Sequence, residues 1–584
     1  MVVAIAMAIA GPSQQRPCAT LLRVSSAPHR PSSSSSWSLP PDWESCIGIE
    51  THAQLLSPTK LFSPTRTSSS PFTPPNTLIN PFDLSHPGTL PSLVQPPTLA
   101  AAIRAALFLN CQVQAESRFD RKHYFYTDLP AGYQITQKWA PFAKGGWIDL
   151  PAEEGQDDVR VEIEQVQLEQ DTAKSTHSTS IEVSDVSQAH IDLNRSNLGL
   201  IEIVSGPQLR SATQAGAYVR KLQELLRRCV ASDGNMETGS MRCDVNVSIR
   251  PRGSREWGTR CEVKNVNGVR FIQKAVRSEI KRQFELLHAS SDGEVRQETR
   301  GFDERTGQTF FLRSKEDAPD YRYMPDANLP PLVLGRGKVE EVRKGLPEHP
   351  DAQKSRLVGK GWRIPERDVG VLMRVGLEGA TLVQEKKEAW AFDRPGVAVE
   401  YLEAVLASSS SSVKLPPSLV AKWIVHEVLK ALNSLPEQEG QSRSAPAPAR
   451  LRELLELVEG KEVTTHNARA ILGKLVEMEN DAGKRKSQES VREMAAAAGF
   501  ISPASAALST SPASTTTSSS PDDALHELCT RVIASLPDEA AKVRAGKVKV
   551  VQRMVGEVMK MSKGQADAKR AREVLLEMCE QAGQ

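Results

Sequence analysis

The sequence predicts an α+β fold: one large domain with an antiparallel β-sheet, then an all-α region and a small helical C-terminal tail. Short runs of alternating apolar and polar residues, at 243–249 and 260–266, are typical of half-buried antiparallel strands. Helical periodicity interrupts such runs at 99–109, 212–230 and 269–287. Beyond Pro347 the strand patterns fade and helical periodicity takes over, so the fold class changes there.

Changes in composition divide the chain into five segments. The helical region shows clear periodicity at 419–432 and 451–458, and its stretches 408–412 and 434–449 have the composition of surface insertions. A later tract rich in Ser, Thr and Pro is typical of a disordered linker. The expected segments are a leader (1–42), a mixed domain (43–340), a helical region (341–500), a linker (501–521) and a helical tail (522–584).

The overall composition excludes several classes of protein. The 584 residues include 73 Lys and Arg against 71 Asp and Glu, a net charge of +2, so nucleic acid could be bound only through local patches. The longest uncharged apolar run, 2–11, is about half of the roughly 20 residues that a membrane-spanning helix needs, and we expect no membrane partner. The eight cysteines form no C-x-x-C pair, which argues against a zinc ribbon and a secreted disulfide framework.

The leader has the composition of an organellar transit peptide. Its first 41 residues contain Arg16, Arg23 and Arg30, no acidic residue, and a serine run at 32–36. A secretory signal is less favoured because no basic residue precedes the apolar run, and an untargeted disordered tail stays open as an alternative.

Acidic and imidazole side chains recur at a spacing of two in the mixed domain. Strand alternation places Glu50, His52 and Gln54 on one face, where a carboxylate and an imidazole can hold a divalent cation. Glu169 and Asp171 repeat the spacing inside 151–200, which has eleven acidic residues against three basic ones. Such a region suits Mg²⁺ bound to a nucleotide. The alternative is a solvated acidic surface with structural pairs.

Two further segments of the mixed domain carry polar groups in unusual places. Glu202 lies in an otherwise apolar strand, so it needs a cationic partner if it is buried, unless the strand is at a sheet edge. The Gly-containing loop 233–240 leads into a strand with Asp244 and Asn246 on one face. Its backbone N–H groups could bind phosphate while these two side chains hold a metal. Neither a Walker loop nor a dinucleotide-binding glycine motif is present.

The tail combines a helical core with a basic patch. Residues 551, 554, 555 and 558 are apolar at helical spacing, which predicts a small bundle beginning near Asp522. Residues 541–570 contain nine Lys and Arg against two acids, a net charge of +7. Such a patch suits a phosphate backbone, although solvated helix faces are also often Lys-rich.

The successive motifs resemble one family, the B subunits of glutamyl-tRNA(Gln) amidotransferases, from about residue 43 to 579. The motifs that carry the resemblance in the mixed domain are 47–54, 124–130 with 132–134, 168–174, 192–207, 233–250, 297–300 and 313–323. Two further motifs, 544–547 and 555–564, lie in the tail. Several long motifs in register are far more specific than any one of them.

The resemblance implies a cradle-shaped catalytic domain that binds ATP and Mg²⁺ and phosphorylates the glutamate carboxylate of misacylated Glu-tRNA(Gln). Ammonia made from glutamine by an amidase (glutaminase) partner, the A subunit, then displaces the phosphate, and a small third subunit braces the pair. The complex is thus a ligase that forms a carbon–nitrogen bond. A non-catalytic tRNA-binding scaffold and amidation of Asp-tRNA(Asn) remain alternatives.

The resemblance also implies roles for individual residues. Glu50, His52 and Glu169 match the metal and active-site cluster, and Lys122 matches the polar lining of the ammonia path. The groups that match ATP, metal or acyl-site positions are Asp192, Arg195, Glu202, Asp244, Asn246 and Lys264. The expected tRNA-binding residues of the tail are Arg544, Lys547, Lys549, Lys560 and Lys563.

Two departures from the family pattern bear on metals and compartment. Gln170 stands where bacterial members often have a second glutamate. The positions of their four-cysteine zinc site are occupied here by Ser63, Thr65, Asn80 and Asp83, which cannot form a thiolate cage, so we predict no structural zinc. The leader and the missing zinc cysteines together predict a mitochondrial matrix protein, with the chloroplast as the alternative.

Overall fold

The computed structural model describes most of the chain from residue 37 to residue 581. The leader prediction therefore falls almost wholly outside the described residues, as do the linker core, Asp83, Lys547 and Lys563. The segments not described are 1–36, 69–72, 82–84, 86–92, 130, 153–157, 180–186, 290–292, 317–319, 377–389, 392–393, 409–412, 437–442, 482–488, 502–520, 545–547, 563–567 and 582–584.

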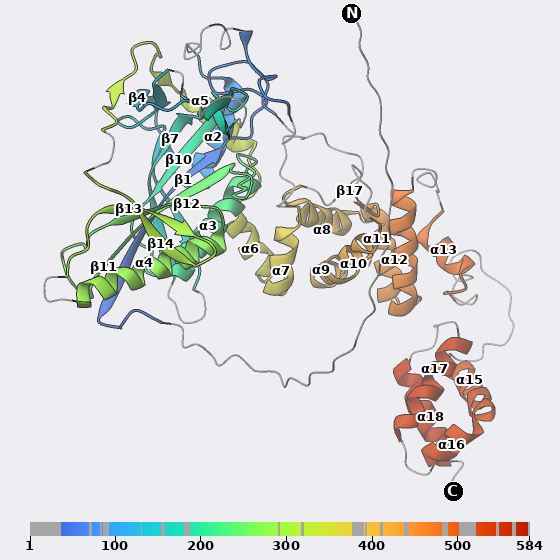
Figure 1. The fold of residues 1–584 in the computed structure, drawn as a ribbon. Helices are drawn as coiled ribbons and strands as arrows, with labels where there is room; N and C mark the ends of the chain where they lie inside the picture. Colours follow the sequence, from blue (N-terminus) through green and yellow to red (C-terminus); the bar gives the residue numbers. More distant parts are fainter. Residues whose placement is uncertain are drawn as a thin grey trace, which may run out of the picture.

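A nine-stranded sheet forms the centre of the mixed domain (Figure 1). Neighbouring strands are antiparallel except β12 and β13, which pair in parallel. This arrangement confirms the predicted α+β class with an antiparallel-dominated sheet. The strands in spatial order are β14 (Gln308–Ser314), β13 (Glu298–Asp303), β12 (Cys261–Val266), β11 (Met241–Pro251), β1 (Trp43–Gln54), β10 (Gly199–Ser205), β7 (Val159–Gln170), β6 (Ala143–Leu150) and β2 (Gln112–Val113).

The two faces of this sheet have different environments. Ile47, Ile49 and Ala53 of β1 are fully or almost fully buried in the main hydrophobic core, which helices α2 (Pro96–Phe108), α3 (Ala212–Arg228) and α4 (Val269–Ala289) complete. The side chains that alternate with them, Glu50 and His52 among others, are only half-buried. Alternation therefore directs the polar series away from the helices.

Smaller strands stand over the polar face. β4 (Asp120–His123), β5 (Tyr133–Thr136) and β15 (Met324–Pro325) form a three-stranded sheet, and the hydrogen bond from Thr136 Oγ1 to Gln167 Oε1, 3.1 Å, ties β5 to β7. Two more strand pairs are described in the mixed domain. They are the hairpin of β8 (Lys174–Thr179) and β9 (Ser187–Asp192) and the pair of β3 (Glu116–Ser117) and β16 (Leu332–Val333).

The helical region has its own core, formed by buried residues between Leu357 and Ile501. The expected helix at 419–432 is present but is interrupted by a π-helical turn, Ile424–Val428. The stretch 434–449 is not wholly a surface insertion, because Ser444 and Ala445 are buried in β18. Helix α5 (Arg336–Lys344) still packs against α2 and the main core of the mixed domain. The elements of the helical region are α6 (Pro350–Val358), α7 (Glu366–Arg374), β17 (Trp390–Ala391), α8 (Val397–Ala407), α9 (Pro417–Trp423), α10 (Leu429–Asn433), β18 (Ser444–Ala445), α11 (Pro448–Glu459), α12 (Thr465–Asn480) and α13 (Val491–Ala497).

The tail is a helical unit with a third core. Its helices are α15 (Pro521–Ser535), α16 (Pro537–Arg544), α17 (Val551–Met561) and α18 (Ala568–Gln581), with a short 3₁₀ turn, Val548–Val550. Val551, Met554, Val555 and Val558 are buried, which confirms the predicted core positions. Among the described residues, no helix is both long and apolar enough to cross a membrane.

Candidate active site

The pairing register of three central strands gathers the acidic side chains that the sequence spreads over 150 residues. His52 on β1 lies directly opposite Glu202 on β10, and Glu202 lies opposite Gln167 on β7. Because β10 has β1 on one side and β7 on the other, the edge-strand alternative for Glu202 is wrong.

His52 links two carboxylates. Its Nδ1 lies 3.1 Å from Oε2 of Glu169, and its Nε2 lies 3.2 Å from Oε1 of Glu50. Burial alone would lower the pKa of His52, but the two carboxylates outweigh it and raise this pKa well above its usual value. Burial likewise opposes ionisation of Glu169, yet His52 and Lys122 hold its pKa at about 2. The three side chains thus form a charged cluster with Glu169 at its buried end.

Glu202 is held in a different way. Its Oε1 accepts a 3.0 Å hydrogen bond from Nε2 of Gln167, and no described residue forms an ion pair with it. Burial and the nearby charge of Glu169 raise the pKa of Glu202 to about 8. Glu202 therefore has an amide donor in place of the expected cationic partner. Its own carboxyl group is mostly protonated at neutral pH.

The cluster fits a divalent cation that takes the place of the protons on His52 and Glu202. One ligand atom each from Glu50, His52 and Glu202 all lie within 4.8 Å of one another. Oε1 of Glu169 is buried and has no hydrogen-bond partner, so the cluster retains an unsatisfied acceptor. Glu169 contacts the far nitrogen of His52, the place from which a carboxylate orients a metal-binding imidazole.

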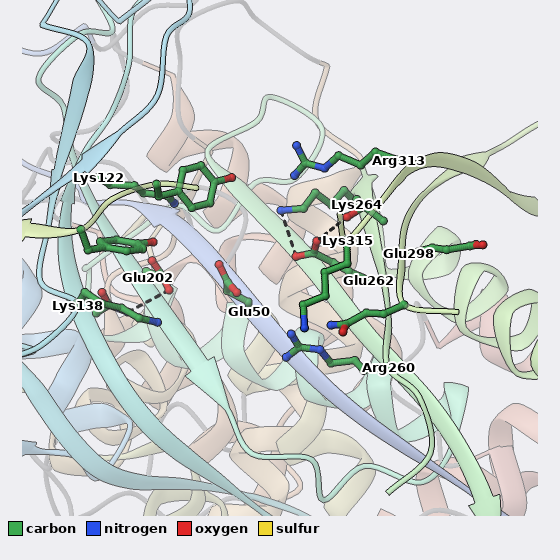
Figure 2. A pocket seen from close by; sticks show the side chains of 15 residues that line it. Glu50, Lys122, Lys138, Glu202, Arg260, Glu262, Lys264, Glu298, Arg313 and Lys315 are labelled. Atoms are coloured by element: carbon green, nitrogen blue, oxygen red, sulfur yellow. Dashed lines mark hydrogen bonds and ion pairs between the residues drawn. The ribbon is translucent and has the colours of Figure 1, made fainter. Parts of the chain in front are cut away.

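A pocket of about 290 Å³ opens beside Glu50 and Glu202. Figure 2 shows basic side chains on both sides of Glu50, with Lys122 and Lys138 facing the others across it. Six cations line the pocket, against the four carboxyl groups of Glu50, Glu202, Glu262 and Glu298. These cations are Lys122, Lys138, Arg260, Lys264, Arg313 and Lys315.

Acidic and aromatic neighbours keep two of these lysines in place and charged. Nζ of Lys264 lies 2.9 Å from Asp244 and 3.1 Å from Glu262, and Nζ of Lys122 lies 5.0 Å from the ring centroid of Tyr321. Burial tends to lower the pKa of both lysines, but nearby acids, Glu169 for Lys122 and Asp244 for Lys264, raise it instead. The pocket therefore presents fixed positive charge that suits a polyphosphate.

Two more pockets extend this site into a groove. One, of about 260 Å³, is lined by His52, Glu169 and Asp244 and shares Lys264 with the first. The other, of about 500 Å³, includes Asn246 and shares Glu50, Glu202, Lys138 and Arg260 with the first. Asp244 and Asn246 thus line different pockets, although they share a strand face.

Two of the expected site residues do not line this groove. Arg195 donates to the carbonyl oxygens of Thr172, at 3.0 Å, and Ala173, at 2.5 Å, so it holds the chain after β7. Oδ1 of Asp192 accepts from the backbone N–H of Asn76 at 3.0 Å. Neither residue lines any of the three pockets.

The loop 233–240, expected to offer its N–H groups to phosphate, uses several of them internally. Asn235 uses its side-chain oxygen to accept from the N–H groups of Glu237, at 2.9 Å, and Thr238, at 3.2 Å. The N–H group of Asn235 itself donates to Asp233 Oδ1 at 2.9 Å. The loop's own side chains thus occupy the donors that a phosphate would need.

Sequence reasoning missed four of the six pocket cations: Lys138, Arg260, Arg313 and Lys315. The motif at 313–323 contains the last two and was their only signal. In the tail, Arg544, Lys549 and Lys560 are exposed as expected.

Comparison with known proteins decides the family. The model of the GatB/GatE catalytic domain matches residues 45–340, and a second, described as the GatB domain, matches residues 515–579. The chain is 45% identical to the B subunit of the mitochondrial glutamyl-tRNA(Gln) amidotransferase of Mycosarcoma maydis, covering 92% of this chain and 86% of that protein. This chain belongs to the GatB/GatE family.

Two further relatives show similarity over nearly the whole chain. The B subunit of the mitochondrial glutamyl-tRNA(Gln) amidotransferase of Laccaria bicolor is 41% identical, with 92% of each chain covered. The B subunit of the aspartyl/glutamyl-tRNA(Asn/Gln) amidotransferase of Persephonella marina is 34% identical over 92% of this chain and 99% of its own. The resemblance of the GatB motifs and the mitochondrial assignment are thereby confirmed.

Proposed function

We propose that this GatB-family chain is the catalytic B subunit of a mitochondrial amidotransferase that converts Glu-tRNA(Gln) to Gln-tRNA(Gln). The observation that carries the proposal is the metal-compatible cluster of Glu50, His52 and Glu202 beside a pocket with six cations. Polyphosphate binding and charge neutralisation are what phosphoryl transfer requires.

The reaction has two balanced steps. A carboxylate oxygen of the esterified glutamate takes the γ-phosphoryl group of ATP, and ADP leaves with the electron pair of the broken bond. Ammonia then adds to the carbonyl carbon, a proton is lost, and inorganic phosphate leaves to give the amide. Phosphorylation is needed because a free carboxylate has no good leaving group.

The chain's own residues would bind and orient in these steps. Lys264, Arg313 and Lys315 would bind the phosphates, and Lys122, near the buried carboxylate of Glu169, would line the route of the incoming amine. Glu50, His52 and Glu202 would hold Mg²⁺, which supplies neutralisation of phosphate charge when bound. Glu169 would orient His52 through Nδ1.

The substrate and the partners follow from the same reaction. The names of the relatives support Glu-tRNA(Gln) as substrate, and the dual name of the Persephonella marina protein keeps Asp-tRNA(Asn) as a second candidate. No part of this mechanism makes ammonia, so an amidase partner, the A subunit of the complex, must supply it, and we include a small third subunit. The exposed Arg544, Lys549 and Lys560 support RNA binding by the tail.

ATP hydrolysis by the purified complex tests this function. We expect turnover to depend on misacylated Glu-tRNA(Gln) and to fall about 100-fold or more in Glu50→Gln, which removes charge but keeps shape. Glu162→Gln, on an exposed position of β7 outside the three pockets, is the matched control. If turnover ignores Glu-tRNA(Gln) and survives Glu50→Gln, the chain is a non-catalytic scaffold instead.

A further inference from the structure

Residues 251–260, which comprise the last residue of β11 and the loop that leads to β12, expose an aromatic ring at the edge of the groove. The side chain of Trp257 is 57% exposed, although a tryptophan normally buries most of its surface. The loop connects the strand that carries Asp244 and Asn246 to the strand that carries Lys264. An exposed ring between two strands of the candidate site calls for a binding explanation.

The ring is held in place rather than left loose. The guanidinium carbon of Arg250 lies 4.4 Å from the ring centroid of Trp257, and Nε of Arg250 lies 2.6 Å from Oε1 of Glu44. Next to the tryptophan, a Cβ added to Gly258 would lie 1.8 Å from the carbonyl oxygen of Ile249. Only glycine therefore allows the loop to approach β11 closely enough to keep this arrangement.

The loop is also strongly basic. From residue 250 to residue 260 there are four arginines and one glutamate. Arg252, Arg255 and Arg260 are exposed. A held aromatic ring among exposed arginines is the combination that binds single-stranded nucleic acid, because bases stack on the ring and phosphates pair with the guanidinium groups.

The position of the loop relates this surface to the chemistry. Trp257, Gly258 and Arg260 line the pocket of about 500 Å³ that also contains Glu50 and Glu202. Arg260 extends into the neighbouring pocket as well. A nucleotide stacked on Trp257 would thus lie in the same pocket as the acidic cluster.

We propose that Trp257 and the arginines of loop 251–260 bind an unpaired nucleotide at the 3′ end of the RNA substrate. This places the end that carries the amino acid at the carboxylate cluster, with a contact separate from the basic tail. The assignment rests on the proposed function, because it takes RNA rather than free nucleotide as the occupant.

Binding of two forms of deacylated tRNA(Gln) to the complete complex tests the assignment. One form is intact, and the other lacks its unpaired 3′-terminal nucleotides. We expect Trp257→Ala to weaken binding of the intact form about tenfold and to change binding of the trimmed form less than twofold. Trp257→Phe should restore most of the affinity, because a phenyl ring still stacks.

A matched pair elsewhere on the sheet provides the control. Trp147 has the guanidinium carbon of Arg160 at 5.1 Å from its ring centroid but lines none of the three pockets, so Trp147→Ala should leave both affinities unchanged. Arg255→Ser should reduce the slope of log affinity against log salt by about 0.7–0.9.

Three results would overturn the assignment. These are no loss of affinity in Trp257→Ala, an equal loss for intact and trimmed tRNA, or an increase in the KM for ATP with unchanged tRNA binding, which would assign the ring to the base of ATP. The binding assay needs no turnover. A complex that binds intact tRNA through Trp257 but forms no amide would therefore refute the proposed function and leave this assignment standing.

Discussion

The acidic and the basic halves of the groove are built differently. The acidic half lies on the central strands β1, β7 and β10, and each of these strands pairs with another strand on both sides. Glu169 is 1% exposed there. In the basic half, Lys264 lies on β12, Arg313 on the edge strand β14 and Lys122 on β4 of the small sheet, and the other three cations lie in loops. Strand register thus fixes the acidic cluster, whereas the basic half depends on separate buried carboxylates that pair with arginines.

His52→Ala is expected to have the largest effect on the acidic half. It removes a side chain that contacts both Glu50 and Glu169, so we expect the Glu-tRNA-dependent rate of ATP hydrolysis to fall about 1000-fold. Glu169→Gln, which keeps shape but loses the charge beside Nδ1, should cost about 10- to 100-fold. Equal rates in wild type and His52→Ala, measured at saturating Mg²⁺, would contradict the assigned cluster.

Glu279→Gln tests the anchor of the basic half. The buried carboxylate of Glu279 on α4 lies 2.6 Å from Arg282 and 3.3 Å from Arg300 of β13. Removing its charge leaves these two guanidinium groups with Glu298 as their shared acidic partner, and we expect a loss of about 2–3 kcal/mol in the free energy of unfolding.

Chemical denaturation followed by near-UV circular dichroism measures the loss at Glu279. Glu285→Gln on the same helix, whose partner Lys281 lies 3.6 Å away and whose side chain is 62% exposed, should cost about 0.5 kcal/mol or less. Similar losses in both variants would mean that the basic half needs no buried ionic anchor.

Asp326 is the corresponding anchor of the small sheet. Burial opposes its ionisation, but the 2.6 Å contact with Nε of Arg121 and two backbone N–H donors lower its pKa below the usual value. The ionised form therefore stabilises the fold above the ordinary carboxyl pKa, and this contribution is lost as the pH falls through the lower, folded-state pKa.

Asp326→Asn is thus expected to destabilise the protein by about 1.5–3 kcal/mol near pH 7. The difference from wild type should stay constant down to about pH 5 and shrink below about pH 4, where the wild-type carboxyl group also becomes protonated. Denaturation midpoints at a series of pH values measure it. A difference that grows on acidification would reverse the sign of the assigned pKa shift.

The sequence could predict the parts of the site that depend on local periodicity. Strand alternation placed Glu50 and His52 on one face, and the structure agrees. It could not show that Glu202 faces His52, because the register of β1 and β10 is set by packing between segments about 150 residues apart. Lys138 and the other three missed cations escaped prediction for the same reason, because their approach to the pocket also depends on how distant segments pack.

Two of the expectations about the site meet local contacts that compete with them. The loop 233–240 contains enough glycine to suggest a phosphate site, but the side chains of Asp233 and Asn235 accept its N–H groups. Arg195 and Asp192 lie in a family motif, yet Arg195 bonds to Thr172 behind the pocket lining and Asp192 accepts from the backbone N–H of Asn76. Presence in a motif thus does not distinguish a residue that builds the site from one that lines it.

Lys315→Ala is expected to have the smallest effect and sharpens the contrast between the halves. Five other cations remain in the pocket, so loss of one should raise the KM for ATP about threefold to tenfold and leave kcat nearly unchanged. Lys281→Ala, on the solvent side of α4, is the control and should change neither constant. A fall in kcat as large as that of Glu169→Gln would mean that Lys315 binds the transferred phosphoryl group itself, and the basic half would then be as specifically built as the acidic one.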